Sequence, residues 1–434
     1  MLALDKMDSA EIGRYLAAQG ALDSEAVVSV KALGGGVSNI VLMVKTPAQC
    51  MVLKQALPEL RVEAYWPSRI DRALREAEAL RIVAGYLPSG AVPEVYFIDE
   101  ENFIYGMSCA PATATLWKED LLSGRVDVPV AVGAGRMLAQ MHAIQDPAVK
   151  QRFSDDEVFW QLRVDPYYNT TADKHPSLRP VFDHAIAQMK ARKLALVHGD
   201  YSPKNMFVLR EGEPSRSDSS TVARGLVPRS GLGVGGAKKM DSRLRGNDGE
   251  SGPPDGPVGG NDGGHVEPRT GAQAPAANAG CKPALPEAIE PAQPEEAVCS
   301  PHEDGGRDQS LLLLDFEVVH WGDPAFDLAF CVNHLLIKSI VNAHVQQDYF
   351  QAVSALLAGY RDELTGVGWT ELQAETLRQL GCLMLARIDG KSPVEYINDE
   401  ATKEMVRRVS KFILNERPGV VDDVYTCIAG EMAN

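Results

Sequence analysis

Apolar residues recur at every second position in several stretches of the first 110 residues, which is the period of a half-buried β-strand. Turn-forming Gly, Pro and Thr residues separate the stretches. They are residues 27–33, 39–45, 50–57, 91–99 and 102–110. In the middle of this region, residues 68–87 place apolar side chains three and four positions apart, which is the spacing of an amphipathic helix. The pattern predicts a small antiparallel sheet with one long helix.

From about residue 117 the apolar spacing becomes helical. The segments that suit amphipathic helices are residues 128–145, 179–193, 326–341, 345–364, 371–388 and 402–414. Two short apolar runs, at 194–198 and 311–316, are predicted to be the strands of one hairpin with a greatly extended tip. The fold class predicted is α+β, with a sheet-containing first part and a mainly helical second part.

One segment differs sharply in composition from the rest of the chain. Residues 211–310 contain 18 Gly and 12 Pro but no Phe, Tyr or Trp. A segment without large apolar side chains cannot offset the entropy lost on ordering, so we predict a disordered insert. The Gly-x-Gly-x-x-Gly pattern at 231–236 lies inside it, without the strand and helix that would make a dinucleotide site. The domains expected are 1–25 (helical), 26–112 (N-lobe), 113–210 (first C-lobe part), 211–309 (insert) and 310–434 (second C-lobe part).

Charge and cysteine usage exclude several classes of protein. The chain has 434 residues and a net charge of -16, so a broad nucleic-acid-binding surface is not expected. Its seven Cys form no Cys-x-x-Cys pair, which favours reduced thiols in a cytosol over a metal site or disulfide framework. Without a signal peptide or transmembrane pattern, the prediction is a cytoplasmic protein that binds no membrane. The oligomeric state stays open.

The strongest chemical signal is VHGDYSPKNMFV at residues 197–208, followed after the insert by LLLLDFE. Asp200 and Asn205 have the spacing of a kinase catalytic loop, and Asp315 follows an apolar run. A carboxylate such as Asp200 can orient a substrate hydroxyl near its proton. Asn205 and Asp315 supply the hard oxygen ligands that Mg²⁺ prefers. Glu317 is a candidate for a second metal or a water.

These motifs resemble those of the aminoglycoside phosphotransferase and choline kinase family. The residues that carry the resemblance are His198, Gly199, Asp200, Asn205, Asp315, Glu317, Gly322, Asp323, Pro324 and Asp327. The resemblance implies a protein-kinase-like two-lobed fold, with a small antiparallel-sheet N-lobe and a mainly helical C-lobe. It also implies transfer of the γ-phosphoryl of ATP or GTP, with Mg²⁺, to a small-molecule hydroxyl. Asp327, and Asp323 likewise, would then brace the catalytic loop, or either of them could be a plain helix N-cap.

The first part of the chain carries the expected nucleotide site. Backbone amides of the Gly34–Gly36 turn and the residues after it could cover phosphates, although three glycines can also be a plain turn; the residues assigned are Gly35, Gly36, Ser38 and Asn39. Lys54 stands where the family has its phosphate-binding Lys, and a Lys among apolar strand residues needs a partner charge. Glu76 is the preferred partner and Glu78 the second, since only one of the two can face Lys54.

The acceptor is not identified by the sequence. Residues 52–73 are similar to the matching stretch of the methylthioribose kinase family, which would suggest a thio-sugar. The clusters at 163–170 and 386–396 could contact substrate or could be packed turns, and Lys204 could reach a phosphate or face solvent. His198 is expected to be structural. Two other functions stay open: a nucleotide-binding regulatory pseudokinase, and a scaffold that acts through the insert.

Overall fold

The structure is a computed structural model. It describes residues 2–22, 29–33, 38–61, 66–210 and 310–433. One compact unit consists of Met1–Ser230 and Ala297–Asn434, and a second consists of Gly231–Glu296. The second unit lies wholly outside the described residues, as does the insert predicted at 211–309. Everything below concerns the first unit.

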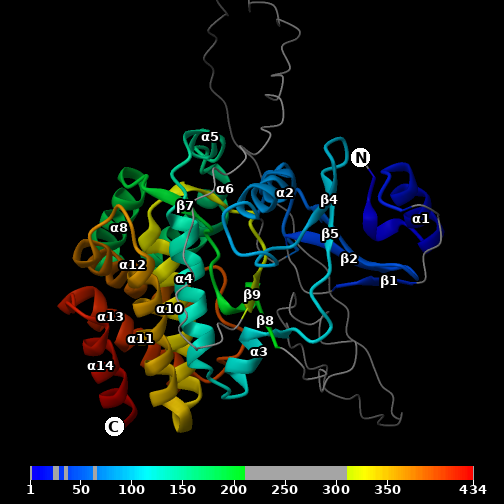
Figure 1. Ribbon diagram of the computed structural model, residues 1–434. Coiled ribbons are helices and arrows are strands. Elements are labelled where there is room, and N and C mark those ends of the chain that lie inside the picture. The colour runs from blue at the N-terminus through cyan, green and yellow to red at the C-terminus, as the bar shows by residue number, and fades with distance from the viewer. Residues whose placement is uncertain (1, 23–28, 34–37, 62–65, 211–309, 434) are drawn as a thin grey trace, which may run out of the picture. The chain divides into compact units, whose positions relative to one another are not determined.

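The N-terminal part of this unit is an antiparallel sheet with the strand order β1-β2-β3-β5-β4 (Figure 1). The strands are β1 (Ser29–Ala32), β2 (Asn39–Lys45), β3 (Cys50–Ala56), β4 (Val95–Asp99) and β5 (Ile104–Ser108). The register pairs Lys54 of β3 with Val41 of β2 and Tyr105 of β5, so Lys54 lies on a central strand. The predicted antiparallel-sheet N-lobe is confirmed.

Helices cover both faces of this sheet. Helix α2 (Arg72–Val83) packs on the face that carries Val41 and Met43. The short η1 (Leu4–Lys6) and helix α1 (Ser9–Ala18) pack on the opposite face, against Ile40 and Leu42. Because β2 is buried on both faces, its sequence is almost continuously apolar. The sheet therefore holds Lys54 in an apolar environment.

Cys50 at the start of β3 and Cys109 just after β5 form a disulfide, with Cα atoms 5.7 Å apart. The prediction of reduced thiols is therefore wrong for this pair. Met51 is paired with Ser108, which makes the two cysteines neighbours across the strands although they lie 59 residues apart. A count of cysteines cannot reveal such a register. Among the described residues, the free cysteines are Cys331, Cys382 and Cys427.

Two small sheets join the lobes at the predicted catalytic segment. Strand β8 (Met206–Leu209) pairs with β9 (Ser310–Leu313) and β6 (Thr115–Leu116), while β7 (Ala195–Val197) pairs with β10 (His320–Gly322). The predicted pairing of 194–198 with 311–316 is therefore wrong. The hairpin partner of β9 is β8. Strand β8 follows the catalytic loop and lies next to the insert in sequence, whereas β7 precedes that loop. The insert still connects the two strands of one hairpin.

The rest of the unit is helical, as the sequence predicted. Its helices are α3 (Trp117–Leu122), α4 (Val128–His142), α5 (Pro147–Arg152), α6 (Glu157–Phe159), the π-helix η2 (Trp160–Asn169), α7 (Thr170–Lys174), η3 (Pro176–Leu178), α8 (Arg179–Ala191), η4 (Pro203–Asn205), α10 (Pro324–Val341), η5 (Ala343–Val345), α11 (Gln346–Glu363), α12 (Trp369–Asp389), α13 (Glu400–Glu416) and α14 (Val421–Ala433). The sequence pattern missed α14 and read η2 as a turn.

Helix α10 lies at the centre of the helical part. It is long and apolar enough to cross a membrane by length and composition alone, but 94% of that stretch is buried, as in the core helix of a folded protein.

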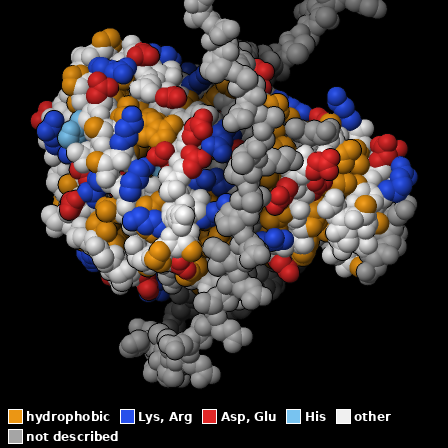
Figure 2. Space-filling view, turned by 90° about the horizontal axis from the view of Figure 1, so that it is seen from above, with side chains coloured by type: hydrophobic (Ala, Val, Ile, Leu, Met, Phe, Trp, Pro, Cys, Tyr) orange, Lys and Arg blue, Asp and Glu red, His pale blue; other side chains and the backbone are white. Residues whose placement is uncertain are grey.

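On the face shown in Figure 2, Lys and Arg side chains are interspersed with Asp and Glu. The described surface on that side therefore has no extended patch of a single charge.

Candidate active site

The β8–β9 hairpin brings the two predicted metal ligands together. Asn205 ends η4 directly before β8, and Asp315 lies two residues after β9. The backbone N–H of Leu314 donates to the carbonyl oxygen of Asn205 at 2.9 Å, so the strand ends stay in register. Residues that are more than a hundred positions apart in sequence thus become neighbours.

Asp200 lies beneath this hairpin and is fully buried. Its Oδ2 accepts a hydrogen bond from Nδ2 of Asn205 at 2.8 Å and forms ion pairs with Arg163 at 3.0 Å and Lys204 at 2.7 Å. Its Oδ1 accepts no hydrogen bond within the described residues. Burial opposes ionisation, but the charges of Arg163 and Lys204 outweigh it and hold the pKa of Asp200 below its usual value. The carboxylate is therefore ionised, with one oxygen available.

The turn that carries Asp200 is held by a second carboxylate. Asp327, in the first turn of α10, accepts hydrogen bonds from the backbone N–H groups of His198 at 2.7 Å and Gly199 at 2.8 Å. His198 is buried; its Nε2 lies 3.0 Å from the carbonyl oxygen of Leu314, and its Nδ1 accepts from the backbone N–H of Asp200. Both side chains thus contact the backbone around Asp200.

Gly199 adopts a φ of +79°, in the left-handed region that favours glycine. A Cβ at this position would also lie 2.9 Å from the carbonyl oxygen of Val318. We expect Gly199→Ala to lower the free energy of unfolding by about 1–3 kcal/mol, measured by urea denaturation. Gly90→Ala is the matched control, because Gly90 has a φ of +80° and no atom within 4 Å of a Cβ. Equal losses in the two variants would contradict the argument from close approach.

Lys54 is 4% exposed and joins α2 to the segment that carries Asp315. Its Nζ lies 2.7 Å from Oε2 of Glu76 and 2.6 Å from Oδ1 of Asp315. Glu78 instead pairs with Arg152, so the alternative partner is excluded. Burial raises the pKa of Glu76, and the charge of Lys54 opposes that rise. Burial acts against the charged form of Lys54, but Asp315 and Glu76 raise its pKa well above the usual value.

Asp315 has a backbone conformation that non-glycine residues seldom adopt, with a φ of +70°. Such strain persists only where the surroundings enforce it, and it is common at functional sites. Burial acts to raise the pKa of Asp315, but Lys54 and Lys204 outweigh it and lower the pKa. The structure thus presents an ionised carboxylate at the end of β9.

The donor set suits Mg²⁺. The carboxylate of Asp315 and the amide oxygen of Asn205 are hard oxygen ligands. In the part of the chain that the structure describes, no three His, Cys, Asp or Glu side chains gather as a metal site. An ion here would therefore need amide, phosphate or water oxygens to complete its coordination.

Glu317 differs from the sequence expectation of a second metal or water ligand. It is 4% exposed, and its carboxylate accepts hydrogen bonds from Ser38 Oγ at 3.1 Å, Asn39 Nδ2 at 2.8 Å and Arg72 Nε at 3.2 Å. The side chains of Ser38 and Asn39, assigned to the nucleotide, thus face Glu317. Gly35 and Gly36 lie outside the described residues. The contacts tie β2 and α2 to the segment that carries Asp315.

Glu317→Gln should weaken this connection. Arg72 is fully buried, and its ion pair is with Glu317. We expect a loss of about 1.5–3 kcal/mol in the free energy of unfolding, because a hydrogen-bonded charge is removed from a buried cation. Urea denaturation measures it, with the exposed Glu94→Gln as control. Unchanged stability together with a raised KM for Mg²⁺ would instead make Glu317 a metal ligand.

Other predicted residues have specific contacts. Asp323 caps α10, accepting from the backbone N–H of Ala325 at 3.1 Å, and pairs with Arg192; it does not reach the turn at Asp200 through any contact in the described chain. Lys204 pairs with Asp200, although its side chain is 42% exposed. The sequence missed the pairing of Arg163 with Asp200. Its only signal was an Arg in a segment with two tyrosines.

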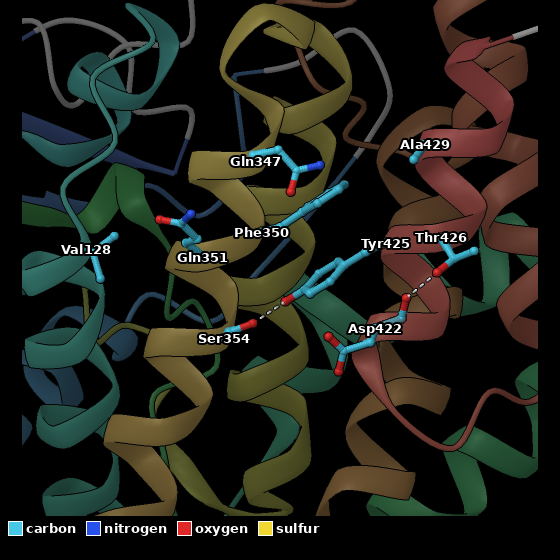
Figure 3. A pocket seen from close by; sticks show the side chains of 9 residues that line it. All are labelled: Val128, Gln347, Phe350, Gln351, Ser354, Asp422, Tyr425, Thr426 and Ala429. Carbon is cyan, nitrogen blue, oxygen red and sulfur yellow. Dashed lines mark hydrogen bonds between the residues drawn. The ribbon is translucent and has the colours of Figure 1, made fainter.

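Two cavities lie outside this group of residues. One, of about 660 Å³, is lined by residues of α4, α11 and α14 and contains none of the predicted site residues (Figure 3). Phe350 and Tyr425 stack within it, and Ser354 Oγ lies 3.2 Å from the hydroxyl of Tyr425. The other, of about 460 Å³, lies between the segment at Trp66 and the π-helix, with Lys391 among its lining residues. Asp200 lines neither cavity.

Known proteins with a similar sequence are phosphotransferases, as the motifs around Asp200 predicted. Residues 29–216 match the model of the phosphotransferase enzyme family. The resemblance inferred from the motifs is thereby confirmed. The match covers the sheet, Lys54, Glu76 and the catalytic loop with Asp200, and it ends before Asp315.

Among curated proteins, the chain is similar to methylthioribose kinases. It is 31% identical over 172 residues to that of Escherichia coli O45:K1 (strain S88 / ExPEC), covering 36% of this chain and 40% of the relative. It is 28% identical over 226 residues to that of Bacillus cereus (strain G9842), covering 45% of this chain and 56% of the relative. The chain thus matches only about half of the length of these relatives.

Solved structures with similar folds are more distant. A choline/ethanolamine kinase family protein from Mesorhizobium loti is 12% identical with a TM-score of 0.40, covering 98% of this chain and 99% of that chain. An ethanolamine kinase from Plasmodium vivax is 11% identical with a TM-score of 0.45, covering 90% of this chain and 83% of that chain.

Proposed function

We propose that this protein is a small-molecule kinase that transfers the γ-phosphoryl of ATP or GTP, with Mg²⁺, to a hydroxyl of a small metabolite or an aminoglycoside-like acceptor. The observation that carries the proposal is the convergence of four residues from distant parts of the chain. Lys54 contacts Asp315, Asp200 contacts Asn205, and the β8–β9 register joins the two pairs. These are the residue types that phosphoryl transfer requires.

Each residue has a role that follows from its contacts. Lys54, positioned by Glu76, would hold the phosphates of the nucleotide. Asn205 and Asp315 would hold Mg²⁺, which when bound neutralises phosphate charge. The ionised Asp200 would orient the acceptor hydroxyl and take up its proton. A bond forms between the acceptor oxygen and the γ-phosphorus, the bond to the β–γ bridging oxygen breaks, and the nucleoside diphosphate leaves.

The arrangement favours an active enzyme over a regulatory pseudokinase. The Lys54–Glu76 ion pair is formed, and Asp200 and Asp315 are held ionised. A pseudokinase typically lacks one of these elements. The third possibility, a scaffold that acts through the insert, concerns residues outside the described part of the chain.

Acceptor-dependent release of ADP from ATP tests the proposal. The full-length protein is incubated with MgCl₂ and, in parallel, with EDTA, in the presence of sugars including methylthioribose, amino alcohols and aminoglycosides. We expect ADP release that requires both Mg²⁺ and one class of alcohol. ATP binding without turnover on any acceptor would contradict the proposal and support the regulatory alternative.

A further inference from the structure

The helical lobe contains a buried lysine without an acidic partner. Lys338 of α10 is 1% exposed; its Nζ donates to the carbonyl oxygen of His334 at 3.1 Å and lies 5.2 Å from the centroid of the Tyr396 ring. Within the described residues it forms no ion pair with a carboxylate. Burial and, after it, the charge of nearby Lys118 lower the pKa of Lys338 to about 7, while Glu395 opposes the shift. A buried ammonium group is unfavourable unless a negative charge accompanies it.

Arg387 of α12 is a second buried cation in the same cluster. It is 8% exposed, and its Nη1 donates to the hydroxyl of Tyr167 at 3.2 Å, to Ser392 Oγ at 3.3 Å and to the backbone carbonyl oxygen of Ser392. It also has no ion pair among the residues described. The carboxylate whose charge acts on both Lys338 and Arg387 is Glu395, which is already paired with Lys118. Three cations thus face one carboxylate.

Several hydrogen-bond donors in this cluster have no partner. Nε2 of His334, Nε of Arg387 and the hydroxyl of Tyr396 are all buried without a hydrogen bond in the described chain. Buried polar groups are nearly always satisfied, so a group of unpaired donors beside unpaired cations indicates a missing acceptor. All three can donate to an oxyanion. The cluster, consisting of Lys338, Arg387, His334 and Tyr396, is therefore suited to a negatively charged group.

The cluster lies beside the catalytic loop. Arg163, which pairs with Asp200, has its Cζ 5.9 Å from the centroid of Tyr167, and Arg387 has its Cζ 5.6 Å from the same centroid. Both guanidinium groups thus lie against the same aromatic ring. Burial is the main cause that lowers the pKa of His334, followed by the charges of Lys338 and Arg387. The charge of Lys204, the partly exposed partner of Asp200, also contributes, so Lys204 lies near this cluster. A small molecule whose hydroxyl reaches Asp200 can place another group in this cluster.

We propose that the cluster of Lys338, Arg387, His334 and Tyr396 binds the anionic group, a carboxylate or a phosphate, of the acceptor whose hydroxyl Asp200 orients. This inference rests on the proposed function and narrows its substrate class to anionic alcohols. A cationic acceptor of the choline type would instead be repelled by the charges of Lys338 and Arg387. The ring of Tyr167 is already in contact with two of the protein's own cations, Arg163 and Arg387.

Matched acceptor pairs test the charge preference. ADP release is measured with D-glycerate against glycerol and with D-ribose 5-phosphate against D-ribose, so that the two pairs distinguish carboxylate from phosphate. Ethanolamine and kanamycin represent cationic acceptors. We expect at least one anionic member to exceed its neutral partner by tenfold or more in kcat/KM. A neutral or cationic acceptor used better than both anions would overturn the inference while leaving the proposed kinase function intact.

Lys338→Met tests the residue itself. Because the substitution removes an unpaired buried charge, Tm should stay the same or rise. KM for the preferred anionic acceptor should rise at least tenfold. KM for the neutral partner of that acceptor should not change. The control is Lys190→Met, which removes an exposed lysine lying 4.7 Å from the Trp160 ring. A fall in Tm with unchanged acceptor KM would make Lys338 merely structural and would overturn the inference.

Binding measurements cover the case in which no acceptor is phosphorylated. Isothermal titration of the full-length protein with D-glycerate and, separately, with D-ribose 5-phosphate needs no turnover. Binding of either anion to the wild type, weakened tenfold or more in the Lys338→Met variant, supports an anion site even if the kinase proposal fails. No binding of either anion would overturn the inference.

Discussion

Replacing Asp200 by Asn is expected to lower kcat for phosphoryl transfer by about 10²–10⁴-fold, the range for loss of a positioned general base. The substitution keeps the shape of the side chain but removes the charge that Arg163 and Lys204 hold ionised. Since neither Lys54 nor Asp315 contacts Asp200 directly, nucleotide affinity should change by less than about threefold, a small free-energy change. Steady-state ADP release and nucleotide titration measure the two quantities.

Asp183→Asn serves as the control for this substitution. Asp183 lies on α8, is half exposed and pairs with Arg179, so it shares the residue type and the Arg partner but not the site. We expect unchanged kcat in that variant. Turnover by the Asp200→Asn protein equal to the wild type would remove Asp200 from the mechanism and with it the strongest argument for a kinase.

Local spacing predicted the parts of the site that lie within one element or one loop. Asp200 and Asn205 are five residues apart, and the short loop brings the side chains within hydrogen-bond distance. Helix geometry predicted that only one of Glu76 and Glu78 would face Lys54, and in the structure Glu76 pairs with Lys54 while Glu78 pairs with Arg152. The antiparallel sheet was predicted from apolar alternation, although its central strands β2 and β3 are buried on both faces.

Contacts that depend on register between distant segments were not predictable in this way. The β8–β9 pairing was missed because two apolar runs, 194–198 and 206–209, flank the catalytic loop, and apolar spacing does not tell which of them pairs with 311–316. The Cys50–Cys109 disulfide depends on the β3–β5 register. Spacing also could not show that Glu317 would be held by Arg72, since the two lie 245 residues apart.

The π-helix η2 shows that local structure, too, was not always predictable from the sequence. Its sequence contains Pro166 and two tyrosines, a composition that propensity assigns to a turn. Packing instead keeps it helical, with Tyr167 and Tyr168 buried. This conformation directs Arg163 to Asp200 and Tyr167 to Arg387, so both contacts depend on a segment that sequence rules would have called irregular.

Lys54→Met is expected to reduce the free energy of unfolding by about 3–5 kcal/mol at pH 8, because it leaves the buried carboxylate of Glu76 and the partly buried carboxylate of Asp315 without their cation. Burial already raises the pKa of Glu76, and Lys54 is the main force opposing that rise. In the variant the folded-state pKa of Glu76 therefore rises further above its unfolded value. A carboxyl group whose pKa is higher in the folded than in the unfolded protein stabilises the fold at low pH. This stabilisation is lost as the pH rises through the pKa of the folded state.

The loss caused by Lys54→Met should therefore be small near pH 5 and grow toward pH 8, as measured by urea denaturation at each pH. Adding Glu76→Gln should recover part of it at pH 8, since one of the two carboxylates is then neutral, and should flatten the pH dependence. Lys45→Met, at the partly exposed end of β2, controls for loss of a lysine from the sheet. A loss of equal size at every pH would mean that Lys54 stabilises the sheet by packing alone, and that its charge does not hold Glu76 and Asp315 together.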